Sequence, residues 1–320
     1  MLLNTSGVLA IVAYISHFFT RSSLLSSQTS KTMGQRVIAV VGTVNSDTTL
    51  IVKRVPDPGE SVRAEDYKQS CGGKGANSAI ASFRSSHVRV RKDESTDGQH
   101  GPAEFVKAAG HVNEVKVRLV AAVGDDGNGE ICRGNLEGNG IDVSGLRVIP
   151  GTITGLSFCV VEQDGGQNRV MSHRGANDAH KPEQFESPDF LEGVDLLISH
   201  LALPLPVVEQ VLETTGKAQV EIVLNAAPAQ RFLRKLWKYV THLIVNETEA
   251  GILSGRPTHE VTVENCKEIS EGFLRKGAKN VVITLGEHGA FYATRDESKN
   301  VVSGHVNAHK VDVKDTTGAG

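Results

Sequence analysis

The sequence has few aromatic residues and no excess of charge of either sign. Phe, Trp and Tyr make up 5% of the 320 residues, and 34 Lys and Arg residues against 37 Asp and Glu residues give a formal charge of −3 at pH 7. A chain with this balance has no electrostatic footprint for nucleic acid or for anionic lipid. We therefore expect no nucleic-acid partner and no membrane partner, and we expect a small molecule instead.

Cysteine is also scarce. The chain has four cysteines, which are far apart and form no C-x-x-C pair: Cys71, Cys132, Cys159 and Cys266. This spacing argues against a structural zinc site and against a disulfide framework. We expect a reduced, cytoplasmic protein, with a nuclear location as an alternative. Cys71 lies beside a glycine-rich loop, where it is either a small packing residue or a redox-sensitive thiol.

No acidic residue precedes Asp47, and residues 1–33 differ in composition from the rest of the chain. Their apolar stretch, Val8 to Phe19, is too short to span a membrane. It has no Lys or Arg before it, as a signal peptide has, and the single Arg21 is too little for a transit peptide. We expect residues 1–33 to lie outside the fold, as an N-terminal extension upstream of a start at Met33 or as a weak targeting segment.

Glycine and apolar residues, by contrast, are plentiful and recur in order. The chain contains 33 Gly, and 39% of its residues are apolar, a balance typical of α/β enzymes with a large core. Apolar runs rich in β-branched residues predict buried strands at 37–41, 119–123, 195–199, 221–224, 242–245 and 280–284. Helical patterns lie between several of these strands, at 75–84, 205–214 and 264–276. Residues 34–320 are therefore expected to form one domain, a three-layer α/β/α architecture with a doubly wound, mostly parallel sheet.

Two stretches with turn signals predict a smaller antiparallel sheet beside the main one. Residues 48–70 contain a Pro-Asp-Pro-Gly turn at 56–59, and residues 156–172 contain an Asp-Gly-Gly turn at 164–166. We expect them to form a small β-sheet lid. The segment 85–116 shows no strand signal, and its polar middle is expected to be a solvent-exposed loop, with a gene-model error as the alternative.

Two polar residues follow the first predicted strand at its carboxyl end, where open α/β sheets place their ligand sites. The carboxylate of Asp47 and the carboxamide of Asn45 can together accept from and donate to neighbouring hydroxyls of a polyol. The alternative is that both are ordinary turn residues.

A glycine-rich loop at residues 72–77 is the more specific signal. Its sequence, Gly-Gly-Lys-Gly-Ala-Asn, lets backbone amides approach a ligand, and Lys74 and Asn77 add a mobile cation and a polar tip. The loop has neither the Walker A spacing nor a dinucleotide fingerprint. The alternative is a plain turn that starts a helix.

These motifs and several others fall in the order and rough spacing of the ribokinases, so the chain resembles that group of the PfkB-type carbohydrate kinases. The resemblance covers about residues 36–320. The matching segments are Gly42–Asp47, Pro56–Glu60, Gly72–Asn77, Gly124–Asp126, Asn225–Ala229, Asn246–Glu249, Thr284–Gly289 and Asp315–Gly320. The resemblance implies a kinase domain with a β lid, ATP as the phosphoryl donor and a homodimer formed through the lid.

The resemblance also implies a role for each matching residue. The expected sugar contacts are Asn45, Ser46, Asp47, Gly73, Lys74, Gly75, Ala76 and Asn77. The expected ATP contacts are Asn246, Thr284, Leu285, Gly286, Glu287, His288, Gly289 and Gly320. Glu249 is expected to hold Mg²⁺ through water, and Asp315 and Thr317 to belong to a potassium-binding loop. The terminal Gly318, Ala319 and Gly320 are expected to form an anion hole for the transferring phosphate.

We therefore expect ATP-dependent phosphorylation of D-ribose at its 5-hydroxyl, which gives ribose 5-phosphate. In ribokinases an aspartate follows directly after the position of Gly320 and acts as the general base, so we expect the chain to be truncated just before its base. The chain as given is then expected to bind better than it catalyses. The alternatives are a catalytically silent sugar- or nucleotide-binding fragment and a kinase for another sugar or a nucleoside.

One departure from the pattern bears on the sugar. Ribokinases typically carry Gln-Leu-Glu after the strand at 195–199, and the glutamate reaches the sugar, whereas this chain has His200, Leu201 and Ala202. Losing one charge-assisted hydrogen bond costs roughly 1.5–3 kcal/mol, or about tenfold to a hundredfold in affinity. His200 is either a substitute contact or a structural histidine.

Overall fold

The main sheet organises the protein. The computed structural model describes residues 35–90, 104–107, 115–163 and 168–308. In the order in which they lie side by side, the strands of the main sheet are β15 (Val301–Val306), β14 (Ala290–Arg295), β13 (Asn280–Thr284), β12 (His242–Asn246), β11 (Glu221–Asn225), β10 (Leu196–His200), β1 (Arg36–Val41), β6 (Val115–Gly124) and β7 (Asp142–Ile149). The strands from β13 to β7 are parallel, whereas β14 and β15 pair antiparallel at one edge. The predicted doubly wound, mostly parallel sheet is confirmed.

The strands form where apolar side chains run without interruption. In β1 the residues from Ile38 to Val41 are fully buried, and every residue of β10 is buried. Such runs are typical of parallel strands that helices cover on both faces. The six strands expected from these runs are all present, within a few residues of the expected bounds.

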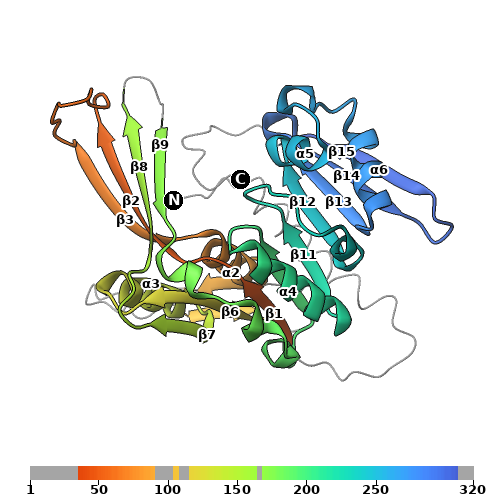
Figure 1. Cartoon of the computed structure of the whole chain (residues 1–320), viewed down its shortest axis with the longest axis horizontal. Helices are drawn as coiled ribbons and strands as arrows, with labels where there is room; N and C mark the ends of the chain where they lie inside the picture. The colour runs from red at the N-terminus through yellow and green to blue at the C-terminus, as the bar shows by residue number, and fades with distance from the viewer. Residues whose placement is uncertain (1–34, 91–103, 108–114, 164–167, 309–320) are drawn as a thin grey trace.

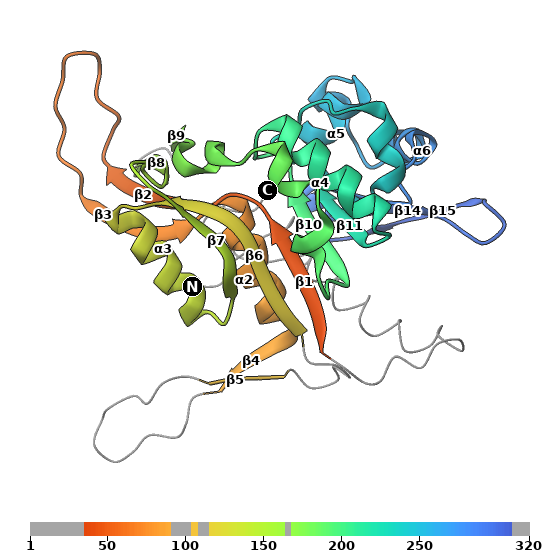
Figure 2. The same ribbon diagram turned by 60° about the horizontal axis from the view of Figure 1, so that its bottom comes forward.

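Helices cover both faces of the sheet (Figures 1 and 2). On one face, α2 (Lys74–Ser86) and α3 (Gly127–Gly138) pack in one core cluster with alternate residues of β1 and β6. On the other, α4 (Leu205–Lys217), α5 (Glu247–Ser254) and α6 (Cys266–Lys276) share a second cluster with β11 and β13. Short 3₁₀ turns complete the structure: η1 (Gly175–Ala179), η2 (Pro182–Phe185), η3 (Pro188–Leu191), η4 (Arg234–Tyr239), η5 (Thr258–Glu260) and η6 (Gly286–His288). The three-layer α/β/α architecture is confirmed.

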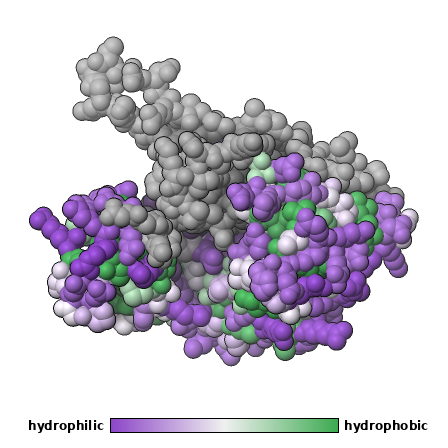
Figure 3. Space-filling model, turned by 90° about the horizontal axis from the view of Figure 1, so that it is seen from above, coloured by the Kyte–Doolittle hydropathy of each residue, from purple (hydrophilic) through white to green (hydrophobic). Residues whose placement is uncertain are grey.

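A second sheet forms the lid. Its strands lie in the order β3 (Asp66–Gly72), β2 (Asn45–Val52), β8 (Gly155–Glu162) and β9 (Asn168–His173). Both predicted antiparallel pairs are present, and β2 joins them by pairing parallel with β8. The lid projects from the main sheet in Figure 1 and forms the left-hand group of coloured atoms in Figure 3, seen from above. Because β2 begins only a few residues after β1 ends, the lid is connected directly to an interior strand of the main sheet.

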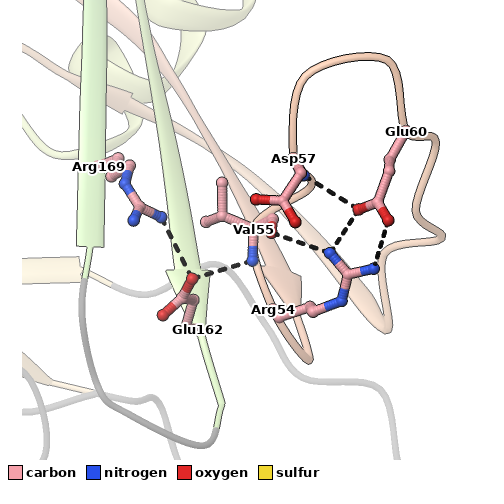
Figure 4. Close-up of polar contacts among 6 residues, drawn as sticks. All are labelled: Arg54, Val55, Asp57, Glu60, Glu162 and Arg169. Carbon is pink, nitrogen blue, oxygen red and sulfur yellow. Dashed lines mark hydrogen bonds and ion pairs between the residues drawn. The ribbon is translucent and has the colours of Figure 1, made fainter.

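Ion pairs fix the far end of the lid (Figure 4). The guanidinium of Arg54 donates to both carboxylate oxygens of Glu60, at 2.5 and 3.0 Å, and the amide of Asp57 donates to the same carboxylate. These donors lower the pKa of Glu60 to about 2. Across the sheet, Glu162 accepts from the amide of Val55 and from Arg169. The predicted turn at 56–59 is thus closed by the glutamate that follows it.

The segment after α2 contradicts the sequence prediction. Residues His87–Val90 form strand β4, which pairs antiparallel with β5 (Glu104–Lys107) in a small separate sheet. The expectation that residues 85–116 lack strands was therefore wrong. The alternation of valine and arginine that begins at Val88 has the two-residue period of a strand. The polar middle of this segment and residues 1–33 lie outside the described residues.

Within the described ranges, no helix has both the length and the apolar character needed to cross a bilayer.

Candidate active site

The predicted site residues gather at one edge of the main sheet. The parallel strands all end at this edge, so the ends of β1, β10, β12 and β13 lie in a row. From β1 the chain goes to β6 and β7 on one side, and it later returns to β10 on the other side. The boundary between β1 and β10 is therefore the topological switch point, where open α/β sheets bind their ligands.

A buried asparagine holds the loop after β1 in place. The side-chain oxygen of Asn177, in η1, accepts from the amide of Val44 at 3.0 Å. Its side-chain nitrogen donates to the Val44 carbonyl and to Asn45 Oδ1, both at 3.0 Å. Asn177 is 1% exposed, so these bonds form away from water. Asn177 was not among the residues predicted from the sequence, although the Gly-Ala-Asn run at 175–177 resembles the end of the loop at 72–77.

Replacing Asn177 by alanine is expected to lower the free energy of unfolding by roughly 1–3 kcal/mol, because buried backbone groups of Val44 lose their partner. The Asn45 side chain also loses its restraint, so sugar affinity should fall. Urea denaturation followed by circular dichroism measures the first effect. Asn307→Ala, at an exposed position, is the control. An unfolding free energy equal to that of the wild type would show that Asn177 does not hold the loop.

Asp47 lies on the face of β2 that also carries Asn45. Its carboxylate packs over Gly72, where an added Cβ atom would lie 1.8 Å from Oδ2. Burial raises the pKa of Asp47 to about 6, and a hydrogen bond with the Ser157 side chain opposes the rise. A carboxylate that is partly stripped of water gains more from accepting hydrogen bonds of sugar hydroxyls than an exposed one does.

Ser46 is not brought together with Asn45 and Asp47. Successive residues of a strand point to opposite faces, and Ser46 is buried on the other face of β2. Its hydroxyl lies 3.2 Å from Asn128 Oδ1 and 2.9 Å from Gln69 Nε2. Ser46 therefore joins the lid to α3 instead of facing the switch point.

Cys71 lies opposite Ser46 in the pairing of β2 with β3. A hydrogen bond with Cys132 and then burial raise the pKa of the Cys71 thiol. Both cysteines are free thiols. A thiol with a raised pKa is a poor nucleophile, which supports the interpretation of Cys71 as a packing residue.

The glycines of the 72–77 loop dock α2 onto the end of β1. A Cβ atom on Gly75 would lie 2.6 Å from the backbone carbon of Gly42, so neither position tolerates a side chain. The amides of Lys74 and Ala76 both donate to Thr43, to its hydroxyl and its carbonyl. These two amides are thus already occupied, contrary to the expectation that the loop offers its backbone to a ligand. The structure therefore shows that the 72–77 loop packs α2 against the end of β1.

Of the remaining loop residues, Ala76 is fully buried in the core, and Gly73 caps α2 with a φ of 90°. Asn77 is exposed and Lys74 is half-buried. The Lys74 charge lowers the pKa of His200 and opposes the rise in the pKa of Glu249. Lys74 therefore lies near the end of β10 and near the predicted nucleotide residues at the same time.

Asn246 and Glu249 form a capping box at the start of α5. The amide of Asn246 donates to Glu249 Oε2 at 2.9 Å, and the amide of Glu249 donates to Asn246 Oδ1 at 2.8 Å. Glu249 is 8% exposed, and burial raises its pKa despite the Asn246 amide and Lys74. One carboxylate oxygen of Glu249 is thus committed to the helix cap.

The loop after β13 lies beside this cap, because Thr284 is the strand partner of Asn246. The Leu285 amide donates to the Gly289 carbonyl at 2.8 Å, which closes a tight turn around η6. Gly286 and Gly289 have positive φ values of 52° and 90°, which glycine adopts without strain. Leu285 is buried in the core, so the turn itself, and not Leu285, is the part that faces outward.

The remaining predicted residues lie outside the described part of the chain: Asp315, Thr317, Gly318, Ala319 and Gly320. Among the residues that the structure does describe, no group of three or more His, Cys, Asp or Glu side chains is placed to hold a metal ion.

His200 ends β10 at the switch point and is fully buried. Burial, and secondarily Lys74, lower its pKa to about 3, so the imidazole is neutral. Its Nε2 lies 2.9 Å from the hydroxyl of Ser78 in α2. His200 therefore packs α2 against β10, which favours the structural interpretation of this histidine over a sugar contact.

An open α/β sheet whose polar residues gather at the topological switch point, beside a β lid, is an architecture suited to binding a small polar ligand. Residues 35–320 match the model of the pfkB family of carbohydrate kinases. The chain belongs to this family.

Comparisons with individual proteins agree with this family assignment. Ribokinase from Schizosaccharomyces pombe is 32% identical over 289 residues, covering 88% of this chain and 81% of the relative. A deoxyribokinase from Salmonella typhi is 30% identical over 285 residues, with 88% and 81% covered. Among solved structures, ribokinase from Thermotoga maritima superposes with a TM-score of 0.67 at 28% identity, covering 88% of this chain and 80% of the other.

Proposed function

We propose that the protein phosphorylates D-ribose at its 5-hydroxyl with ATP as the donor. The observation that supports this most directly is the arrangement of the two halves of the site along one sheet edge. Asn45 and Asp47 follow β1, whereas Asn246 and Glu249 follow β12, three strand spacings or roughly 14 Å away. The charge of Lys74 acts on His200 at the end of β10 and on Glu249. This separation suits a sugar at the switch point and a nucleotide whose phosphates extend toward it.

Each described residue has a definite task in this proposal. Asp47 accepts hydrogen bonds from sugar hydroxyls and so orients the acceptor, and Lys74 places positive charge where the phosphoryl group is transferred. Asn177 holds the sugar loop in its productive geometry. The predicted anion hole at 318–320 is proposed to complete the site.

The residues fit Mg²⁺ bound through water. The helix cap uses one carboxylate oxygen of Glu249, Oε2, and leaves the other for a ligand. Mg²⁺ usually retains several waters and takes one or two carboxylates together with phosphate oxygens. When bound, the ion neutralises phosphate charge. The predicted potassium residues Asp315 and Thr317 are proposed to act next to the anion hole.

Turnover and binding measured on the same preparation test the proposed function. ADP release is assayed with ribose, 2-deoxyribose, fructose and adenosine in the presence of Mg²⁺ and K⁺, and sugar binding is measured by calorimetry. Ribose-dependent ADP release supports the proposal. A preference for 2-deoxyribose would shift the substrate to that of the deoxyribokinase relatives, and binding without turnover would support a catalytically silent sugar-binding protein. Neither binding nor turnover with any sugar would overturn the proposal.

We propose that the face of the lid that carries Phe158 and Met171, here called the outer face, pairs with a second copy of the chain. Strand pairing places Phe158 beside Met171 on the face that carries Ser46, and Tyr67 lies beside Leu50 on the same face. Phe158, Met171 and Tyr67 are 40%, 62% and 56% exposed. An apolar group of this kind is typical of an interaction surface.

The double change Phe158→Asp and Met171→Asp is expected to convert a dimer into a monomer, because two charges would be buried without partners. Light scattering coupled to size exclusion measures the mass. Val170→Asp is the matched control, since Val170 is equally exposed but points to the opposite face of β9. A monomeric wild type, or a dimer that survives the double change, would contradict the proposed pairing.

A further inference from the structure

Arg174 lies next to the sugar loop by its backbone. It follows β9 at the base of the lid, directly before η1. Its carbonyl accepts from the side-chain nitrogen of Asn177 at 2.9 Å, and the same nitrogen donates to Asn45 Oδ1 at 3.0 Å. One amide group thus holds Arg174 and a predicted sugar contact together.

The guanidinium of Arg174 reaches the other side of the switch point. Its Nη2 donates to the carbonyl of Ala202 at 2.9 Å, just past the end of β10. Since β1 and β10 are neighbours, the side chain extends between the two loops that border the predicted sugar position. Ala202 itself offers no polar side chain there.

Part of the guanidinium is left over for a ligand. Nε lies 2.7 Å from Asp178 Oδ1, and Nη2 is engaged by Ala202. Among the described residues, Nη1 has no hydrogen-bond partner, and the side chain is 48% exposed. Arg174 therefore retains N–H donors at the site.

The charge balance indicates which ligand group these donors suit. The ion pair with Asp178 compensates the charge of Arg174, so a neutral hydroxyl is favoured over a carboxylate or phosphate. A guanidinium only donates and a carboxylate only accepts, whereas a sugar hydroxyl does both. The donors of Arg174 and the acceptor oxygens of Asp47 are therefore complementary to the hydroxyls of a polyol.

We infer that Arg174 is a specificity-determining residue that donates a hydrogen bond to the 2- or the 3-hydroxyl of the acceptor sugar. The inference rests on the proposed function. It assigns to the lid base a donor that complements Asp47.

Deoxygenated sugars test this contact. Calorimetry gives Kd for ribose, 2-deoxyribose and 3-deoxyribose with the wild type and with Arg174→Met. The change is expected to raise Kd for ribose about tenfold to a hundredfold, because a hydrogen bond to a charged group is lost. For the deoxysugar that lacks the contacted hydroxyl, Kd should be the same in both proteins. The matched control is Arg169→Met, because Arg169 is an exposed arginine of β9, the strand that Arg174 follows, and its partner Glu162 lies at the far end of the lid.

The outcomes separate the two proposals. An equal loss of affinity for ribose and for both deoxysugars would show that Arg174 only connects the lid to β10. An unchanged affinity for ribose would show that Arg174 does not contact the sugar. Either result overturns the inference. Arg174→Lys, which keeps the charge without the fork of donors, should recover only part of the ribose affinity. Calorimetry measures binding without turnover, so the two proposals can fail separately. A wild type that binds no sugar counts against the proposed function. A wild type whose Kd for every sugar equals that of Arg174→Met counts against the contact.

Discussion

Asp47→Asn is expected to lower kcat/KM for ribose by roughly a hundredfold to ten-thousandfold, since about two hydrogen bonds to a charged acceptor are weakened at roughly 1.5–3 kcal/mol each. The carboxylate is partly buried over Gly72, so water does not replace the lost contacts. Steady-state kinetics over a range of ribose concentrations measures the effect. Asp66→Asn, on the exposed part of the lid, is the matched control and should leave kcat/KM unchanged.

The same residue predicts a pH dependence. Its pKa is raised to about 6, so ribose affinity should fall as pH drops below about 6 and the carboxylate takes up a proton. Folding has the opposite sign: a carboxyl whose pKa is higher in the folded state favours the protonated form. Its contribution to stability is present at low pH and is lost as pH rises from about 4 to about 6. Asp47→Asn should abolish both trends, and a ribose affinity that is flat between pH 5 and 7 in the wild type would contradict this assignment.

Glu249→Gln is expected to raise the Mg²⁺ concentration needed for half-maximal activity and to lower kcat about tenfold to a hundredfold, in the range of changes to groups that orient metal-bound water. Glutamine also serves at this position of a capping box, so the helix cap survives. The free energy of unfolding should therefore change by less than about 0.5 kcal/mol. Magnesium titration of the nucleotide complex by calorimetry gives a measurement independent of turnover.

Glu249→Ala provides the comparison. It removes the charge and the cap together, so stability should fall by about 1 kcal/mol more than in the glutamine variant. If both variants bind magnesium and nucleotide as the wild type does, Glu249 is only a cap. If the glutamine variant is as unstable as the alanine variant, the capping geometry is not what holds the start of α5.

Runs of apolar residues in the sequence predicted the strands of the main sheet well where the runs were unbroken. Residues 37–41 of β1 and 196–198 of β10 are continuous apolar runs, which are typical of strands buried on both faces. Elements with mixed composition were not predicted: β7, β14 and β15 carry exposed residues among buried ones, and α5 has only eight residues. Their structure is set by neighbours in the sheet, which a local pattern does not contain.

The sequence predicted where in the fold the candidate site lies, but it did not predict which residues of each motif face the site. Asn45, Asp47 and Lys74 have polar tips near the switch point, as their sequence motifs suggested. Ala76 lies in the 72–77 segment and Leu285 in the 284–289 segment, yet both are buried in the core, since such segments also contain residues that pack. Asn177 was not predicted because its partner Asn45 lies 132 residues earlier in the chain. Arg174 was not predicted because its partner, the carbonyl of Ala202, lies beyond the next strand of the main sheet.

The division of the main sheet between β1 and β10 also orders the site along the chain. Every described residue of the proposed sugar side precedes α4, from Asn45 to Ala202, and every described residue of the proposed nucleotide side follows it, from Asn246 to Gly289. A recombination break within α4 would therefore exchange the acceptor half of the enzyme and leave the donor half intact. Chimaeras joined there offer a direct route to new acceptor specificities, and the same junction gives evolution a way to reuse one nucleotide half with many sugars.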